Sequence, residues 1–303
     1  MMGNKLPNFL IVGAAKSGTS SLHNYLNQHP DVFMPSYNSE GMKVKEPRFL
    51  IKELVKERLH NGVWSLEEYQ SLFYNVQDEK MIGESTVLYL YYYNEAIKNI
   101  KNYLGDDVKI IIMLRNPIDR AFSAYTHVAR SVKENLTFEE ALQAEEGRLD
   151  KDTHLTPMVM YKDMGMYHSM VKAYLENFKA IHVIMYEDFQ NDTQKVVDAT
   201  FKFLGVSKDD SIDTVSKHNV GGKSWKAPLL KQFFMKDNFL KKGLRFVFSK
   251  SLRLKVRDML ESFLKEKAKP INPETKKELI SFFKNDVEKL EQLLNVNLKN
   301  WKE

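Results

Sequence analysis

The sequence contains no cysteine. This absence excludes disulfide bonds and thiolate metal sites, and it fits a protein that works in a reducing compartment. The sequence also has no apolar run near the ~20 residues that a membrane-spanning helix requires. The stretch from Met1 to Pro7 is too short to hold a signal peptide before the first apolar segment begins. From these absences we expect a cytoplasmic protein that does not span a membrane.

Internal repeats, low-complexity tracts and long linkers are absent as well. A chain of 303 residues with 43% hydrophobic content is long enough for one large α/β domain or two small ones. The net charge of +5 is unevenly placed, because residues 217–269 contain 15 lysines and arginines against 4 aspartates and glutamates. Such a segment attracts a nucleotide, an acidic substrate or a membrane surface, although a solvated lysine-rich helical face has the same composition.

Short apolar runs alternate with helical patterns along the chain. Strands are predicted at 9–12, 81–84, 109–114 and 181–186, and helices at 21–26, 66–74, 94–104, 137–146, 165–178 and 193–204, with further helices from Pro117 and Pro273. The run Lys109–Leu114 shows no alternation, so both faces of this strand are expected to be covered, as in a parallel sheet. The sequence therefore predicts an α/β protein with a central parallel sheet flanked by helices.

The C-terminal region is predicted to be helical. An apolar stripe runs along its last helix, at Leu279, Phe283, Val287, Leu290 and Leu294. Residues at this spacing share one helix face, so the helix is expected to brace the core. We therefore treat residues 1–303 as one domain, with a core at 7–216 and a basic helical lid and C-terminal brace at 217–303.

The stretch from Phe9 to Leu22 has the layout of a phosphate-binding loop. A short apolar run is followed by small residues, two glycines and a helical pattern. Backbone N–H groups at the start of such a helix, together with the helix dipole, bind anions. The usual nucleotide loop places lysine after its second glycine, whereas Thr19 follows Gly18 here and the lysine comes earlier, at Lys16. A tight turn capped by serine or threonine is the structural alternative.

A second anion site is predicted at the end of the strand 109–114. Arg115 follows this strand, and Ser123 lies eight residues further on, in the predicted helix. A guanidinium and a hydroxyl near a helix start can bind a phosphate. The structural alternative pairs Arg115 with Asp119 or Glu84. A kinase or ATPase would instead need an acidic residue near a strand end to hold magnesium, so a ligand with two separated phosphates fits better.

These two motifs resemble those of the sulfotransferases that use 3′-phosphoadenosine-5′-phosphosulfate (PAPS). The family's K-x-G-T-[ST] loop is matched by Lys16–Ser20, and its R-N-P-x-D-R-x-x-S-x-Y motif by Arg115–Tyr125. The resemblance implies a three-layer, P-loop-like α/β fold. It also implies that PAPS is the sulfuryl donor, that 3′,5′-adenosine bisphosphate (PAP) is the product, and that no metal ion is needed.

The resemblance also assigns roles in donor binding. The lysine loop grips the 5′-phosphosulfate, Arg115 and Ser123 bind the 3′-phosphate, and the tyrosine of Tyr186-Glu187-Asp188 lies near the nucleotide. A late loop at 218–223 is similar to the one that closes over the 3′-phosphate. The implied donor-binding residues are Lys16, Ser17, Gly18, Thr19, Ser20, Arg115, Ser123, Tyr186, Gly222 and Lys223.

The catalytic residues point to one branch of the family. Cytosolic phenol and steroid sulfotransferases carry a histidine after the second core strand, where this chain has Glu84-Ser85-Thr86. The segment 45–50, K-E-P-R-F-L, instead resembles the K-E-P-x-F-F stretch of the heparan-type and bacterial branches. This resemblance implies that Glu46 is the general base, with Lys16 as the second catalytic residue. A surface salt-bridge cluster is the structural alternative for Glu46, and His127 is the alternative base.

Other functions remain open from the sequence alone. A P-loop kinase acting on a small molecule is the nearest enzymatic alternative, and a non-catalytic nucleotide-binding or membrane-surface module is another. Residues 233–264 mix phenylalanines with lysines, which is typical of a peripheral membrane helix, a lid or a packed helical pair. The acceptor is predicted to be a carbohydrate, a lipid or a small alcohol, recognised by loops 36–75 and 129–160. No nucleic-acid partner is expected, and the oligomeric state is not predicted.

Overall fold

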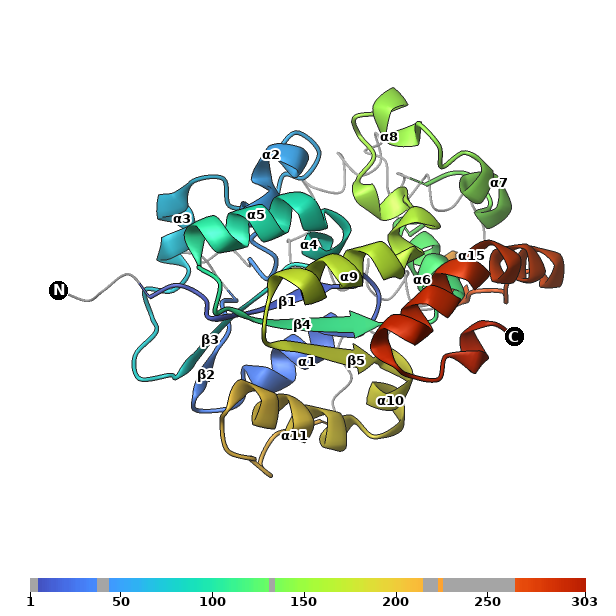
Figure 1. The fold of residues 1–303 in the computed structure, drawn as a ribbon. Coiled ribbons are helices and arrows are strands. Elements are labelled where there is room, and N and C mark those ends of the chain that lie inside the picture. The colour runs from blue at the N-terminus through green and yellow to red at the C-terminus, as the bar shows by residue number, and fades with distance from the viewer. Residues whose placement is uncertain (1–4, 37–43, 131–133, 215–222, 226–264) are drawn as a thin grey trace, which may run out of the picture.

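The computed structural model describes residues 5–36, 44–130, 134–214, 223–225 and 265–303. Its centre is a parallel five-stranded sheet with the strand order β2-β3-β1-β4-β5 (Figure 1). The strands are β1 (Phe9–Gly13), β2 (Val32–Phe33), β3 (Met81–Ser85), β4 (Lys109–Leu114) and β5 (Ile181–Met185). Helices pack on both faces and make three layers. The predicted α/β fold with a central parallel sheet is confirmed.

The helices follow the predicted order closely. They are α1 (Thr19–Leu26), α2 (Lys52–Val55), α3 (Leu66–Ser71), α4 (Leu88–Tyr91), α5 (Tyr93–Tyr103), α6 (Pro117–Val128), α7 (Phe138–Gln143), α8 (Arg148–Lys151), α9 (Tyr167–Asn177), α10 (Tyr186–Asn191), α11 (Thr193–Leu204) and α15 (Pro273–Leu294). Short 3₁₀ turns occupy Phe49–Ile51, Pro157–Val159, Asp163–Gly165 and Lys299–Trp301. The predictions missed α4 and the short helices α2 and α8, because pieces of about one turn carry little periodicity.

The central strand β1 supplies both halves of the core. Phe9 and Ile11 face one way and pack with residues of α1 and α11, whereas Leu10 and Val12 face the layer of α4, α5 and α9. All four side chains are fully buried. A strand covered on both faces has no polar side to show, which is why the sequence of β1 lacks alternation.

The end of the last predicted strand, at Tyr186, differs from the prediction. The last strand was expected to include Tyr186, but β5 ends at Met185, opposite Leu114, the last residue of β4. With no partner beyond Leu114, the chain turns into α10, whose first turn contains Glu187 and Asp188. Acidic residues favour this position because they complement the helix dipole. Tyr186 therefore stands at the carboxyl edge of the sheet, as the first residue of a helix.

The C-terminal helix α15 packs on α9 and α6. Leu279, Phe283, Val287 and Leu290 are buried beneath it, while Leu294 is partly buried. The carboxylate of Asp286 accepts hydrogen bonds from the backbone N–H of His168 at the start of α9. This contact fixes one end of α9 against the C-terminal region.

Part of the basic region departs from the helical prediction. The short strand β6 (Lys223–Trp225) pairs antiparallel with β7 (Lys265–Lys267), some forty residues later. Helical periodicity carries no information about a pairing between segments so far apart. The predicted lid, the membrane-contact segment 233–264 and Gly222 lie outside the described residues, as does the side chain of Lys223. Their proposed roles stay predictions.

The adjacent residues Phe282 and Phe283 provide a matched test of how α15 packs. Phe283 is fully buried against Gly165, whereas Phe282 is 47% exposed. We expect Phe283→Ala to lower the free energy of unfolding by about 3–5 kcal/mol, since it leaves a cavity. The control Phe282→Ala should cost less than about 1 kcal/mol. Urea denaturation of both variants measures the difference, and equal losses would contradict this packing.

Candidate active site

The loop between β1 and α1 has the backbone shape of an anion site. Lys16 and Gly18 have positive φ angles of 71° and 90°, and Gly18 directly precedes α1. A Cβ atom on Gly18 would lie 3.1 Å from the ring of Tyr186. Glycine is therefore required here both by the left-handed backbone and by the close approach to this ring. The loop begins at the carboxyl end of the central strand, where ligands bind to sheets of this type.

The hydroxyl side chains of the loop are mostly buried. Ser17 and Thr19 are covered, while Ser20 is half-buried. Among the described residues, Ser17 Oγ has no hydrogen-bond partner. The loop thus fits a bound phosphate in two ways: its backbone is wound for close approach, and one of its buried polar groups is left for a further partner.

Lys16 lies in a strongly positive environment. Burial and the nearby charges of Arg130 and Arg115 lower the pKa of Lys16 to about 8, and the carboxylate of Glu46 partly opposes this shift. A cation surrounded by other cations is destabilised until an anion arrives. Glu46 and Lys16 are more than 25 residues apart in the chain, so the fold brings together the two predicted catalytic residues.

Arg115 contacts the lysine loop directly. Its Nη1 donates a 3.2 Å hydrogen bond to the carbonyl oxygen of Lys16, and its guanidinium lies 4.7 Å from the ring centroid of Tyr186. The described residues contain no ion pair of Arg115 with Asp119 or Glu84, the pairing that the structural alternative required. Lys16, Gly18, Arg115 and Tyr186 therefore form one cluster, which we name the donor cluster.

The backbone beside Arg115 is clamped from two directions. The hydroxyl of the buried Tyr167 donates a 3.0 Å hydrogen bond to the carbonyl of Arg115. On the other side, Glu187 Oε1 accepts a 3.0 Å hydrogen bond from the N–H of Asn116. Asn116 in turn caps α6 through its side chain, which accepts from the N–H of Ile118 at 3.0 Å. The turn that carries Arg115 is thus fixed independently of any ligand.

Ser123, His127 and Arg130 follow one another along α6 and its end. Spacings of four and three residues place them on one face of a helix. Arg130 and Lys16 both influence the titration of His127, so this face is turned toward the lysine loop. The surrounding protein and these two cations lower the pKa of His127. Ser123 shares the face, but no described contact joins its hydroxyl to Arg115.

Glu46 lies between two cations. Its carboxylate is 3.5 Å from Lys45 Nζ and 3.5 Å from Arg48 Nη2, and its side chain keeps 21% of its surface exposed. This is the geometry of a salt-bridge cluster, the structural alternative. The same carboxylate also affects Lys16, so it stands at the edge of the donor cluster and remains accessible.

Sequence reasoning missed three residues that shape this site. Arg130 carries a detectable signal, because it lies seven residues after Ser123 and therefore on the same helical face. Glu187 belongs to the Tyr186-Glu187-Asp188 motif, but this motif does not predict its hydrogen bond with the N–H of Asn116. Tyr167 gives no local signal, since its partner Arg115 is 52 residues away.

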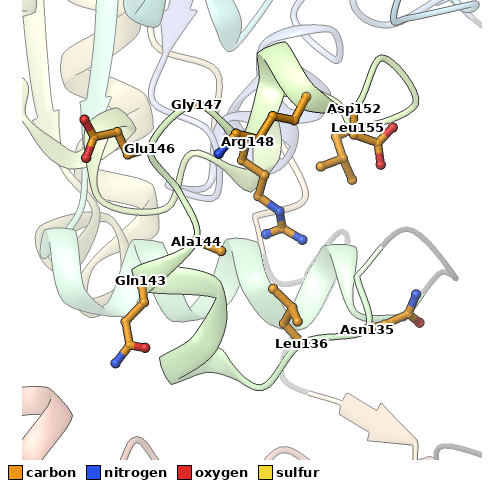
Figure 2. A pocket seen from close by; sticks show the side chains of 10 residues that line it. Asn135, Leu136, Gln143, Ala144, Glu146, Gly147, Arg148, Asp152 and Leu155 are labelled. Atoms are coloured by element: carbon orange, nitrogen blue, oxygen red, sulfur yellow. The ribbon is translucent and has the colours of Figure 1, made fainter.

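A separate hollow of about 890 Å³ lies between α7 and α8 (Figure 2). Its lining is mostly polar, and Arg148 stands in its middle. Arg148 is held there by two 2.8 Å hydrogen bonds to the buried carboxylate of Glu134. The lining residues are Asn135, Leu136, Gln143, Ala144, Glu146, Gly147, Arg148, Lys151, Asp152 and Leu155. Of the residues predicted for the donor or for catalysis that the structure describes, none lines this hollow.

The described residues offer neither a cluster of metal-binding side chains nor a helix that could span a membrane. In this part of the chain, histidine, aspartate and glutamate side chains do not gather in groups of three or more that could hold a metal ion. Over the same residues, every helix is too short or too polar to cross a membrane.

Comparison with known proteins gives consistent matches. A solved sulfotransferase from Alicyclobacillus acidocaldarius shares 31% identity, covers 99% of this chain and 100% of its own, and superposes with a TM-score of 0.72. The membrane-associated sulfotransferase kil1 of Dictyostelium discoideum is 30% identical over 43% of this chain. The human bifunctional heparan sulfate N-deacetylase/N-sulfotransferase 3 is 27% identical over 67%. The chain spans about a quarter of the length of these two curated relatives.

The relatives include heparan-type and bacterial proteins, the branches that the K-E-P stretch indicated. The family model described as "Sulfotransferase domain" matches residues 6–271. This match spans the lysine loop, the Glu46 segment and the Arg115 motif in one alignment. The chain belongs to the sulfotransferase family.

Proposed function

We propose that this protein transfers the sulfuryl group of PAPS to an acceptor hydroxyl. The observation that carries this proposal is the donor cluster, in which Arg115 is hydrogen-bonded to the backbone of Lys16 and packs on Tyr186. Two cationic residues beside an aromatic ring match a nucleotide, which carries several negative charges and a planar base. The family match supports the same activity.

The residues present fit the donor. Lys16 and the N–H groups of the loop up to Ser20 would hold the 5′-phosphosulfate, because they meet at the start of α1. Arg115 and Ser123 would hold the 3′-phosphate, and Tyr186 would contact the nucleotide. Gly18 lets the ring of Tyr186 approach the loop closely, because a side chain there would meet this ring.

PAPS, when bound, supplies a sulfuryl group on a phosphate that can leave. Lys16 and the loop N–H groups stabilise the negative charge that develops on the leaving oxygen, as preorganised donors do in phosphoryl transfer. Glu46 accepts the proton of the acceptor hydroxyl, which makes the oxygen a better nucleophile. Its neighbours Lys45 and Arg48 hold the carboxylate in place at 3.5 Å each.

Glu46 is proposed as the base in preference to His127, because Glu46 lies in the K-E-P stretch shared with the heparan-type and bacterial branches. The surrounding protein and the charges of Lys16 and Arg130 lower the pKa of His127, which makes its imidazole a weaker proton acceptor.

The acceptor is proposed to be a hydroxyl of a carbohydrate, a lipid or a small alcohol. The polar hollow at residues 135–155 lies within one of the two loops predicted to recognise it (Figure 2). Side chains such as Gln143, Glu146 and Lys151 suit hydrogen bonds to a hydroxyl-rich ligand. The cysteine-free composition supports a cytoplasmic location as part of this proposal.

The 3′-phosphate is the feature that separates PAP from ADP and AMP. We expect PAP to bind at least ~10-fold more tightly than either nucleotide in isothermal titration calorimetry, a difference of about 1.4 kcal/mol. Ser123→Ala should weaken PAP binding while leaving ADP binding unchanged, so ADP serves as the internal control. Equal affinities of the unaltered protein for PAP and ADP would reject the donor assignment.

The lowered pKa of Lys16 makes nucleotide binding dependent on pH. At a pKa of about 8, half of the Lys16 side chains are neutral at pH 8, and a bound phosphate restores their charge. PAP binding at pH 8 should therefore take up about half a proton, and its affinity should fall as pH rises through 8. Calorimetry in buffers of different ionisation enthalpy measures this uptake. It should disappear in Lys16→Met, which should also lose turnover by at least ~100-fold.

Glu46→Gln separates catalysis from donor binding. The amide keeps the shape but cannot accept the proton, so transfer should fall at least ~100-fold while PAP affinity stays within about twofold. Transfer is measured as labelled sulfate moved from PAPS to a panel of glycans, lipids and small alcohols. Glu53→Gln, which alters an exposed carboxylate on α2, is the matched control. Full transfer by the Glu46 variant would remove this residue as the base.

A further inference from the structure

Glu84 is a buried carboxylate that the proposed reaction does not use. It lies near the end of β3 and has no exposed surface. Its Oε2 accepts hydrogen bonds from the hydroxyls of Tyr69 at 2.6 Å and Tyr89 at 3.2 Å, and its Oε1 accepts one from Thr86 at 2.7 Å. Burying a charged group without a paired cation is costly, so this arrangement calls for a reason.

Each of the three hydroxyl donors also holds a residue of the segment that carries Glu46. Thr86 Oγ1 accepts the N–H of Arg48 at 3.3 Å, and Tyr89 Oη accepts the N–H of Leu50 at 3.3 Å. The ring of Tyr69 stacks on the intervening Phe49, with centroids 4.5 Å apart and planes 16° apart. Three consecutive residues, 48–50, are therefore gripped by the three side chains that converge on one carboxylate.

The direction of the hydrogen bonds depends on the carboxylate. A hydroxyl has one proton to donate, and Thr86 and Tyr89 both give theirs to Glu84. Their lone pairs are then free to accept the backbone N–H groups of Arg48 and Leu50. Because Glu84 accepts a hydrogen bond from both hydroxyls, it determines the direction of every hydrogen bond between the backbone N–H groups and the carboxylate.

The same group of residues is tied to the lysine loop. In the sheet register Glu84 stands opposite Leu10 of β1, the strand that leads into that loop. The N–H of Thr86 donates a 3.1 Å hydrogen bond to the carbonyl of Ile11 on this strand. Thr86 therefore connects β1 on one side with the segment of Glu46 on the other.

We propose that Glu84 is a positioning residue, whose carboxylate fixes the Glu46 segment at a set distance from Lys16. The proposal rests on the proposed role of Glu46 as the base. A base must be held close to its working geometry, and a displacement of about 1 Å can cost a factor of ~100 in rate. Glu84 supplies this rigidity indirectly, through the hydroxyls of Thr86 and Tyr89, and has no proposed contact with the substrate.

We name Glu84 and its three hydroxyl partners, Tyr69, Thr86 and Tyr89, the Glu84 clamp. The hydrogen bonds of this clamp depend on pH. The groups that face Glu84 are Tyr69, Tyr89 and Tyr174, all with raised pKa values, and the carboxylate of Glu46. Burial raises the pKa of Glu84 to about 7, against the opposing effect of its three hydrogen bonds. Above pH 7 the carboxylate accepts all three bonds. As pH falls below 7 it gains a proton of its own to donate, and one hydroxyl loses its acceptor.

Amide hydrogen exchange of the full chain, followed residue by residue by NMR, tests the clamp directly. In Glu84→Gln the amide NH₂ competes with the hydroxyl protons, so the N–H groups of Arg48 and Leu50 should exchange at least ~10-fold faster at pH 8. PAP affinity should change by less than about threefold, and transfer should fall by ~10–100-fold. In the unaltered protein, protection of the same two amides should drop between pH 8 and pH 6.

Tyr174→Phe is the matched control. Tyr174 donates a 2.9 Å hydrogen bond to the carbonyl of Tyr89 in the same buried layer but makes no hydrogen bond to Glu84. Its loss should lower stability while the exchange of Arg48 and Leu50 stays slow. If Glu84→Gln fails to fold, Thr86→Val, which removes the acceptor of Arg48, replaces it.

The outcomes separate this inference from the proposed function. Unchanged exchange of Arg48 and Leu50 in the Glu84 and Thr86 variants would overturn the clamp, whatever the role of Glu46. Faster exchange confined to these amides, together with lost transfer, supports it. Full transfer by Glu46→Gln would instead reject the base while leaving the exchange result valid.

Discussion

The hydrogen bond from Arg115 to the carbonyl of Lys16 is the contact on which the site depends. It joins the ends of two neighbouring strands, β1 and β4, and it holds two cations close together in a partly buried place. Like charges at this distance repel one another, so the arrangement is unfavourable until an anion fills it. The positive field of Lys16, Arg115 and Arg130 is therefore best explained as preparation for a ligand with several negative charges.

Because these cations repel one another, the backbone that carries them must be held in place by the rest of the fold. Tyr167 and Glu187 hold the backbone on both sides of the Arg115 turn. Trp301 packs against Tyr167, with ring centroids 6.2 Å apart, so the end of the chain stabilises the first of these supports. On the opposite side, the hydroxyl groups around Glu84 hold the segment of Glu46. The fold thus holds the Arg115 turn and the Glu46 segment through separate sets of contacts.

Much of this could be predicted from the sequence because it depends on local patterns. The non-alternating strands, the lysine loop and the Arg115 motif each lie within about a dozen residues, and the structure places them at one edge of the sheet. The clamp around Glu84 could not be predicted, because it joins Arg48 to Thr86 and Leu50 to Tyr89 across nearly forty residues. The sequence predicts Tyr186 within a strand because it does not show where the neighbouring strand ends.

The donor cluster joins residues that are far apart in the sequence, and this separation has a consequence for biosynthesis. Lys16 and Arg115 are 99 residues apart, and Tyr186 follows another 71 residues later. A nascent chain therefore has no complete donor cluster until the fifth strand has left the ribosome and paired. Nucleotide binding at this cluster, as we propose it, would stabilise the finished fold by mass action. Cells with ample nucleotide would in this way hold more of the newly made protein in its working form.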